Sequence, residues 1–219
     1  MIHKNPVTEF CHRAHTPGID ATAFIHPAAC VVGHVLIGRR VMVSPFASVR
    51  GDEGHPIIIG DDSNLQDGVV IHALETEHMG RPVEENLVVV HGIKAAVYVG
   101  KRVSVAHQAQ LHGPVRIGED TFIGMKSLVF RAGVGKNCVV EPGCLVMNVH
   151  VDDGRYIPAG TVVKDQGNAD RLPFITDDYP FKNLNGDVVR VNTGLASGYH
   201  EMDLPSSGFW EGPAHVETD

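Results

Sequence analysis

The sequence has 219 residues, of which 43% are apolar and 20% charged, enough for one well-filled core in an ordinary globular protein. A formal charge of −8 without clusters of Lys and Arg argues against nucleic acid as a partner, because phosphate binding depends on such clusters. The sequence lacks the roughly 18 consecutive apolar residues of a membrane span and the apolar core of a secretory signal, so we expect no membrane partner and a cytoplasmic protein, or a secreted one if a leader was removed.

Residues 1–18 carry no regular pattern and are expected to form an N-terminal extension. From Ile19 onward, aliphatic residues recur every six positions, with a few interruptions. The eighteen members are Ile19, Ile25, Val31, Ile37, Val43, Val49, Ile59, Leu65, Ile71, Val99, Val105, Leu111, Ile117, Ile123, Val129, Val134, Val140 and Val146. A six-residue period fits neither an α-helix nor an alternating strand, but it fits a hexapeptide β-helix, in which three short strands make one triangular coil.

We therefore expect residues 19–165 to form an all-β, left-handed parallel β-helix. The left hand is typical of the fold class and is not shown by the sequence. Residues 75–97, which include E-T-E-H-M-G-R-P-V-E-E-N, interrupt the repeat as an acidic loop. A connection of this length inside a tight repeat is usually functional or disordered, and the plain alternative is a solvated acidic loop.

Residues 166–204 are expected to form a linker and a C-terminal α-helix packed alongside the β-helix. Val188, Val191, Leu195 and Tyr199 follow one another at helical spacing from about Val188 to Met202. The tail at 205–219 is expected to be a mobile segment or a surface strap. The four cysteines, which show no CxxC spacing, are expected to be small buried residues without a disulfide.

Counting blocks brings two histidines together. His72 and His112 each occupy the second position of a block, and the two blocks are one coil apart if the acidic loop adds none. Their imidazoles would then stack about 4.8 Å apart on one face. His107 belongs to a different face, so a neighbouring subunit of a homotrimer would have to supply it. Three nitrogen ligands leave a metal position open for water, as a catalytic site requires.

The same count places polar residues around these histidines. Arg50 lies one coil below His72, and Gln66 lies one coil below the block that carries His107. Asp52 stands near Arg50, and an Arg50–Asp52 pair between subunits is expected, with trimer adhesion as plausible a role as catalysis.

Four segments carry a resemblance to a known family: S-V-R-G-D-E-G, S-N-L-Q-D-G-V-V-I-H-A-L-E-T, V-S-V-A-H-Q-A-Q-L-H-G-P and T-F-I-G-M. Together they resemble the archaeal-type gamma-class carbonic anhydrases, from N-P-V-T near the start to V-N-x-x-L-A-x-G-Y near the end. The resemblance implies the metal ligands His72, His107 and His112, the residues Gln66 and Asn192 near the metal-bound solvent and substrate, Glu53 and Glu75 in proton transfer, and Arg50, Asp52, Asn64 and Asp67 at the subunit contact or the substrate. It also implies reversible hydration of CO2 to bicarbonate and a proton by a metal-bound hydroxide at the subunit interfaces, with Zn²⁺ first and Fe²⁺ or Co²⁺ as alternatives.

Two other functions fit the same fold. A hexapeptide acyltransferase needs only one catalytic histidine, and a non-catalytic scaffold subunit could retain the site. The three histidines with Gln66 favour a metal over acyl transfer, and Glu75 argues against a scaffold. His55 and His78 lie near the acidic residues, where either could supplement proton transfer.

Overall fold

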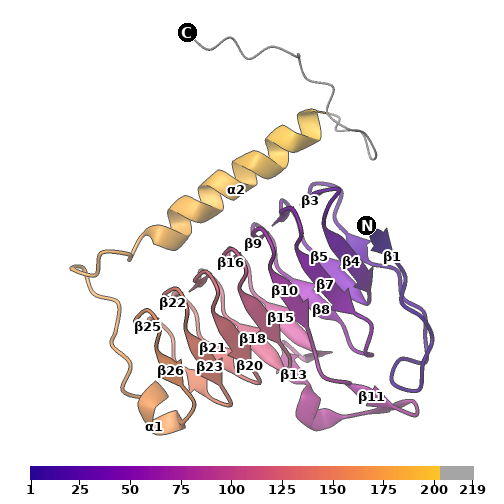
Figure 1. Cartoon of the computed structure of the whole chain (residues 1–219), viewed down its shortest axis with the longest axis horizontal. Coiled ribbons are helices and arrows are strands. Elements are labelled where there is room, and N and C mark those ends of the chain that lie inside the picture. The colour runs from indigo at the N-terminus through magenta and orange to yellow at the C-terminus, as the bar shows by residue number, and fades with distance from the viewer. Residues whose placement is uncertain (203–219) are drawn as a thin grey trace.

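The computed structural model describes residues 1–202, so the expected tail at 205–219 lies outside the described chain. These residues form a parallel β-solenoid of three sheets with a long helix beside it (Figure 1). This confirms the hexapeptide β-helix and the C-terminal helix expected from the sequence.

Each coil of the solenoid contributes one short strand to each sheet. The first sheet contains β1 (Ile2–His3), β4 (Cys30–Gly33), β7 (Ser48–Gly51), β10 (Val70–His72), β17 (Gln110–His112), β20 (Leu128–Phe130), β23 (Leu145–Met147) and β26 (Val162–Val163). The second contains β2 (Gly18–Ile19), β5 (Val35–Ile37), β8 (Ile57–Ile59), β15 (Val97–Val99), β18 (Val115–Ile117), β21 (Gly133–Val134) and β24 (His150–Val151). The third contains β3 (Phe24–Ile25), β6 (Met42–Val43), β9 (Asn64–Leu65), β16 (Ser104–Val105), β19 (Phe122–Ile123), β22 (Val139–Val140) and β25 (Tyr156–Ile157).

The six-residue repeat forms the core. In the first sheet Val49 pairs with Ile71, and Ile71 with Leu111, so equivalent positions stack from coil to coil. All three side chains are buried, and burial of each such aliphatic side chain contributes about 1.5–3 kcal/mol. The repeat weakens at its start, where Ile19 and Ile25 are only partly buried.

The corners require small residues where backbones approach. A Cβ added at Gly60 would lie 2.6 Å from the backbone of Gly100, too close for any side chain.

Cys138 and Cys144 are buried in the solenoid and free, as is Cys11 in the N-terminal extension. Cys30 is only half-buried, which corrects the expectation that all four cysteines are buried.

The acidic loop adds no coil, because β10 pairs directly with β17. It is not irregular: it contains two antiparallel hairpins joined by a short 3₁₀ turn. Its elements are β11 (Glu77–His78), β12 (Arg81–Pro82), η1 (Glu84–Asn86), β13 (Val88–Val90) and β14 (Ile93–Ala95). The loop therefore leaves the register of the solenoid intact.

Two helices follow the last coil, α1 (Gln166–Ala169) and α2 (Leu184–Glu201). Helix α2 begins one turn earlier than expected and runs along the third sheet (Figure 1). Its buried residues are Asn185, Asn192 and Ala196, whereas Val191 and Leu195 are 49% and 44% exposed. The expected apolar stripe is thus divided: Val188 and Tyr199 pack against residues of the third sheet, whereas Val191 and Leu195 stay half-exposed. No helix among residues 1–202 combines the length and the apolar character needed to cross a bilayer.

Candidate metal centre

His72 and His112 lie one above the other on the first sheet, at the ends of β10 and β17. The two residues are direct register partners, so parallel pairing positions both side chains outward on neighbouring coils. Their ring centroids are 5.5 Å apart with the planes at 81°. The column expected from counting blocks is therefore present.

Charged groups surround the His72 ring. Its Nε2 atom lies 3.2 Å from Asp52 Oδ1, 3.3 Å from Glu53 Oε1 and 3.0 Å from Arg50 Nη2. Hydrogen bonds to Asp52 and then Glu53 raise the pKa of His72 to about 9, and the bond from His72 lowers the pKa of Asp52. Ligand atoms of Asp52, Glu53 and His72 lie within 4.8 Å of one another, so this cluster has the composition and spacing to hold a cation.

The His112 ring has the opposite character. Its Nδ1 atom is buried and has no hydrogen-bond partner among the described residues. Burial, and then the charge of His72, lowers the pKa of His112. A buried, neutral imidazole with an unused nitrogen fits a metal ligand, because metals bind the neutral ring. At His72 an ion would have to displace the proton that Asp52 and Glu53 favour, because metal binding releases ligand protons; with that exchange, His72 and His112 are compatible with a bound metal.

The two carboxylates expected to act in proton transfer lie beside this pair. Glu53 and Glu75 line one pocket of about 310 Å³ together with His72 and His112. Phe10 from the N-terminal extension also lines it, a residue that the sequence reasoning missed because no pattern connects the extension to the site. The acidic loop therefore brings Glu75 to the metal centre.

His107 lies on a different sheet. It follows β16 in the third sheet, and its Nδ1 atom lies 3.1 Å from Asp67 Oδ2. Both side chains are 52% exposed. The structure does not bring His107 to His72 and His112 within one chain, as expected from its position in the repeat.

A chain of side-chain hydrogen bonds runs along the third sheet, which also carries His107. Ser104 accepts a hydrogen bond from Asn64, 2.9 Å, and Asn64 accepts one from Gln66, 3.0 Å. All three residues are buried on the third sheet. Ser104 was missed in the sequence, although the register that pairs Leu65 with Val105 also pairs Asn64 with Ser104.

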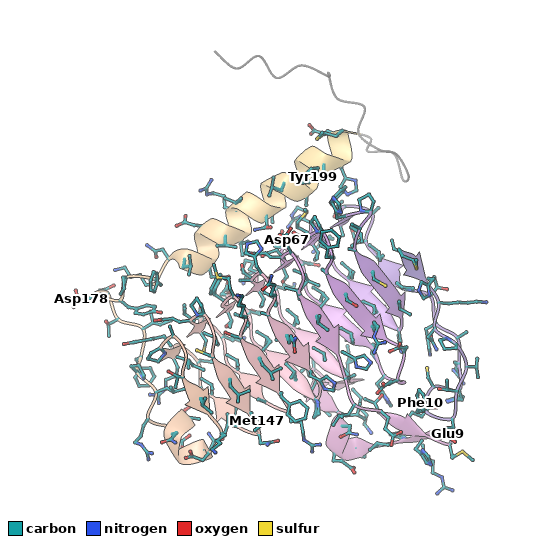
Figure 2. The ribbon with its side chains drawn as sticks, viewed as in Figure 1. Glu9, Phe10, Asp67, Met147, Asp178 and Tyr199 are labelled. Atoms are coloured by element: carbon teal, nitrogen blue, oxygen red, sulfur yellow. The ribbon has the colours of Figure 1, made fainter. Side chains whose placement is uncertain are left out.

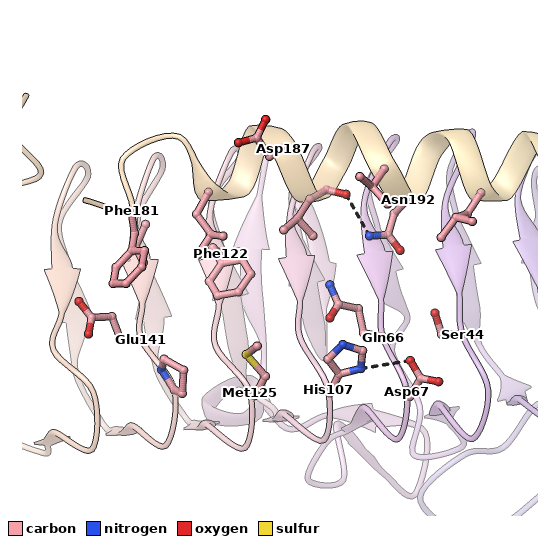
Figure 3. Close-up of a pocket in the computed structure, with 16 residues that line it drawn as sticks. Ser44, Gln66, Asp67, His107, Phe122, Met125, Glu141, Phe181, Asp187 and Asn192 are labelled. Atoms are coloured by element: carbon pink, nitrogen blue, oxygen red, sulfur yellow. Dashed lines mark hydrogen bonds and ion pairs between the residues drawn. The ribbon is translucent and has the colours of Figure 1, made fainter. Parts of the chain in front are cut away.

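Gln66, His107 and Asn192 line a groove of about 640 Å³ between the third sheet and α2 (Figure 3). Asn192 donates its amide to Val188 O, 2.9 Å away in the preceding turn. The rest of the lining is mainly apolar and includes Phe122, Met125, Phe181, Leu184, Val191 and Leu195.

The predicted site residues thus form two groups. The first group is Arg50, Asp52, Glu53, His72, Glu75 and His112, and the second is Asn64, Gln66, Asp67, His107 and Asn192. His55 and His78 line neither of the two cavities. The backbone N–H of His55 donates to Thr76 Oγ1, 2.6 Å, and His78 is exposed in β11.

Comparison with known proteins identifies relatives of this chain. A family model described as the hexapeptide repeat of succinyl-transferase matches residues 114–147. The chain is 55% identical over 201 residues to a carbonic anhydrase of Methanosarcina thermophila, covering 91% of this chain and 81% of that relative. It is 38% identical over 195 residues to the carboxysome assembly protein CcmM of Nostoc sp., covering 89% of this chain but only 33% of that relative.

A solved structure of a hexapeptide transferase family protein from Anaplasma phagocytophilum superposes with a TM-score of 0.63. It is 24% identical and covers 84% of this chain and 93% of that one, which shows the shared fold alone. The identity to the Methanosarcina relative is much higher, 55% with 91% of this chain covered. The chain therefore belongs to the gamma-class carbonic anhydrases.

Proposed function

We propose that this protein is a metal-dependent carbonic anhydrase that catalyses the reversible hydration of CO2, and that its active site forms where two subunits of a homotrimer meet. The observation that carries the proposal is the division of the ligand set: His72 and His112 share the first sheet, and His107 lies on the third. Identity of 55% to a carbonic anhydrase supports the reaction.

The metal would be held by His72 and His112 of one subunit and His107 of the next. Zn²⁺ is the first choice, with Fe²⁺ or Co²⁺ also suited to imidazole ligands. When bound, such an ion lowers the pKa of a water molecule from near 16 to about 7, so that hydroxide is available near neutral pH to attack CO2.

Gln66 and Asn192 would position the reacting molecules. Gln66 is fixed through its amide nitrogen to Asn64, so its carbonyl oxygen keeps a defined direction as an acceptor. Asn192 is anchored to its own helix through its amide nitrogen in the same way. Each side chain can therefore orient water or substrate without a large loss of side-chain freedom.

Glu53 and Glu75 would carry the released proton away. Both line the pocket that contains His72 and His112, and both side chains reach solvent. A carboxylate in this position can accept a proton and pass it to buffer. In this role Glu75 gives the acidic loop a function beyond solvation.

The groove supports the trimer. It exposes Val191, Leu195 and Met125 beside His107, and a neighbouring first sheet packed here would cover them. Arg50 and Asp52 lie 3.8 Å apart within one chain, and we propose that they also pair across the subunit contact.

Measurement of CO2 hydration by the purified protein, with and without a chelator, tests the reaction. A carbonic anhydrase loses activity with its metal and regains it on readdition, whereas an acyltransferase or a scaffold shows no metal-dependent hydration. Metal analysis after anaerobic purification identifies the ion.

The ligand set is tested by His107→Ala, which should remove metal binding and leave a folded solenoid. The exposed His3→Ala is the matched control and should keep its metal. Normal metal content in His107→Ala would contradict the proposed ligand set.

A further inference from the structure

A third cavity, which shares no lining residue with the His72–His112 pocket, lies where the acidic loop passes over the second sheet. It has a volume of about 550 Å³. Val88 and Val89 of β13 form one wall, and the corner residue Val149 lies in the other. The charged residues of its lining are Glu85, Arg116, Arg131 and His150.

Three stacked positions of the second sheet line this cavity, and the middle position is a glycine. Arg116 pairs with Gly133, and Gly133 pairs with His150, on successive coils of the second sheet. A Cβ at Gly133 would lie 2.6 Å from His150 Nδ1, so the ring of His150 leans over the glycine. Arg116 and His150 therefore stand on either side of a position that has no side chain of its own.

The two arginines are unusual in having no acidic partner. Both are half-buried, and no ion pair or side-chain hydrogen bond among residues 1–202 involves either guanidinium. Most other arginines of the solenoid are paired with a carboxylate: Arg39, Arg40, Arg50, Arg102 and Arg155. The chain has 26 acidic residues, so acidic groups are plentiful elsewhere.

Glu85 is the only carboxylate of the lining, and it is exposed and more than 4.0 Å from both guanidinium groups. A half-buried guanidinium gains most from a bound oxyanion, because its fork of N–H donors matches two oxygen atoms at once. Two such groups and an imidazole in the lining of one cavity supply it with three donor side chains.

We propose that this cavity binds a small oxyanion, a phosphate or a carboxylate of bicarbonate size, between Arg116, Arg131 and His150. The anion would lie over Gly133, with β13 covering it. This site is distinct from the candidate metal centre, because the two cavities share no lining residue, although Arg131 donates its backbone N–H to His112 O, 3.2 Å. The proposal does not depend on the reaction assigned above.

Methyl NMR of the metal-loaded protein tests the site, with Val89 and Val149 as reporters in the walls and Val7 as a remote reference. Inorganic phosphate and bicarbonate are titrated separately at constant ionic strength, with chloride as the control. We expect saturable shifts of Val89 and Val149 with at least one oxyanion. The anion that saturates at the lower concentration identifies whether phosphate or bicarbonate is preferred.

The double variant Arg116→Gln/Arg131→Gln should lower the affinity for the saturating oxyanion at least about tenfold, because two charge-assisted contacts are lost. Arg116→Lys keeps the positive charge but loses the paired N–H donors of the guanidinium, so it should lower the affinity less. Arg13→Gln, which removes an exposed arginine of the extension, should bind as wild type. Methyl shifts that match the wild type outside the cavity show that all three variants are folded. Shifts no larger than with chloride, or unchanged affinity in the double variant, would overturn the proposal.

Discussion

Asp67 shows how a single residue can prepare a metal ligand. Its Oδ2 atom lies 3.1 Å from His107 Nδ1, so this ring nitrogen faces a carboxylate and Nε2 is the nitrogen left for an ion. A carboxylate behind a ligating imidazole fixes both its tautomer and its direction, and its loss typically costs 10- to 100-fold in metal affinity.

We predict that Asp67→Asn weakens metal binding by about 10- to 100-fold without unfolding the solenoid. Titration of the apo-protein against a competing chelator measures the change. Asp61→Asn is the control, because Asp61 pairs with Arg39 on the surface and faces no histidine ligand. Equal affinities for the two variants would show that Asp67 has no such role.

Among the elements, the N-terminal extension holds the acidic loop to the solenoid. His12 pairs with Glu77, and Met79 N donates to Glu9 O, 2.8 Å. Figure 2 shows Glu9 and Phe10 beside the loop. Behind them the rings of His15 and His34 stack in parallel, 4.0 Å apart with 3° between the planes. The stack connects residues 1–18 to the corner between β4 and β5.

This stack predicts a pH-dependent attachment of the loop. Burial, and then the neighbouring charge of His34, lowers the pKa of His15 below 6.5 in the folded protein. The unfolded chain therefore binds a proton more readily, and stability falls as pH drops below 6.5. Arg13 and His12 also disfavour protonation, whereas Glu77 favours it.

Hydrogen exchange of residues 75–83 should show this effect as lower protection factors, corrected for the intrinsic rate, between pH 6.5 and 5.5. His15→Phe keeps a stacking ring that cannot be protonated, so its protection should change less with pH. The same pH dependence in both proteins would exclude His15 as the cause.

The sequence predicts some elements of the fold better than others. The solenoid follows from its period, because every block repeats one local environment, and the His72–His112 column follows from the block count. The position of Phe10 does not, because it depends on the path of an extension without a repeat. The half-exposure of Val191 and Leu195 does not follow from the sequence either, because helical spacing of apolar residues does not show how deeply each one is buried.

At the scale of the whole molecule, the proposed ligand set predicts an oligomer. Each chain carries His72 and His112 on one sheet and His107 on another. Around a threefold axis every first sheet would meet a neighbour's third sheet, which gives three equivalent sites of mixed composition. If all the ligands came from one chain, each site would depend on that chain alone. Sites shared between two subunits and sites within one subunit can therefore be told apart by combining variant chains.

Mixing two inactive variants tests this arrangement. His107→Ala subunits lack the third ligand, and His72→Ala/His112→Ala subunits lack the other two, so neither alone should hydrate CO2 above background. When the two are refolded together in equal amounts, about three quarters of the trimers contain both chains and each of these has one complete site of three. Activity should therefore return to about one quarter of the wild-type value, with a proportional gain in bound metal. The same proteins mixed without refolding should stay inactive, because intact trimers do not exchange their chains quickly. If refolded mixtures are as inactive as their parents although trimers form, the ligands do not come from two subunits, since random assembly must bring an intact His107 beside an intact His72 and His112.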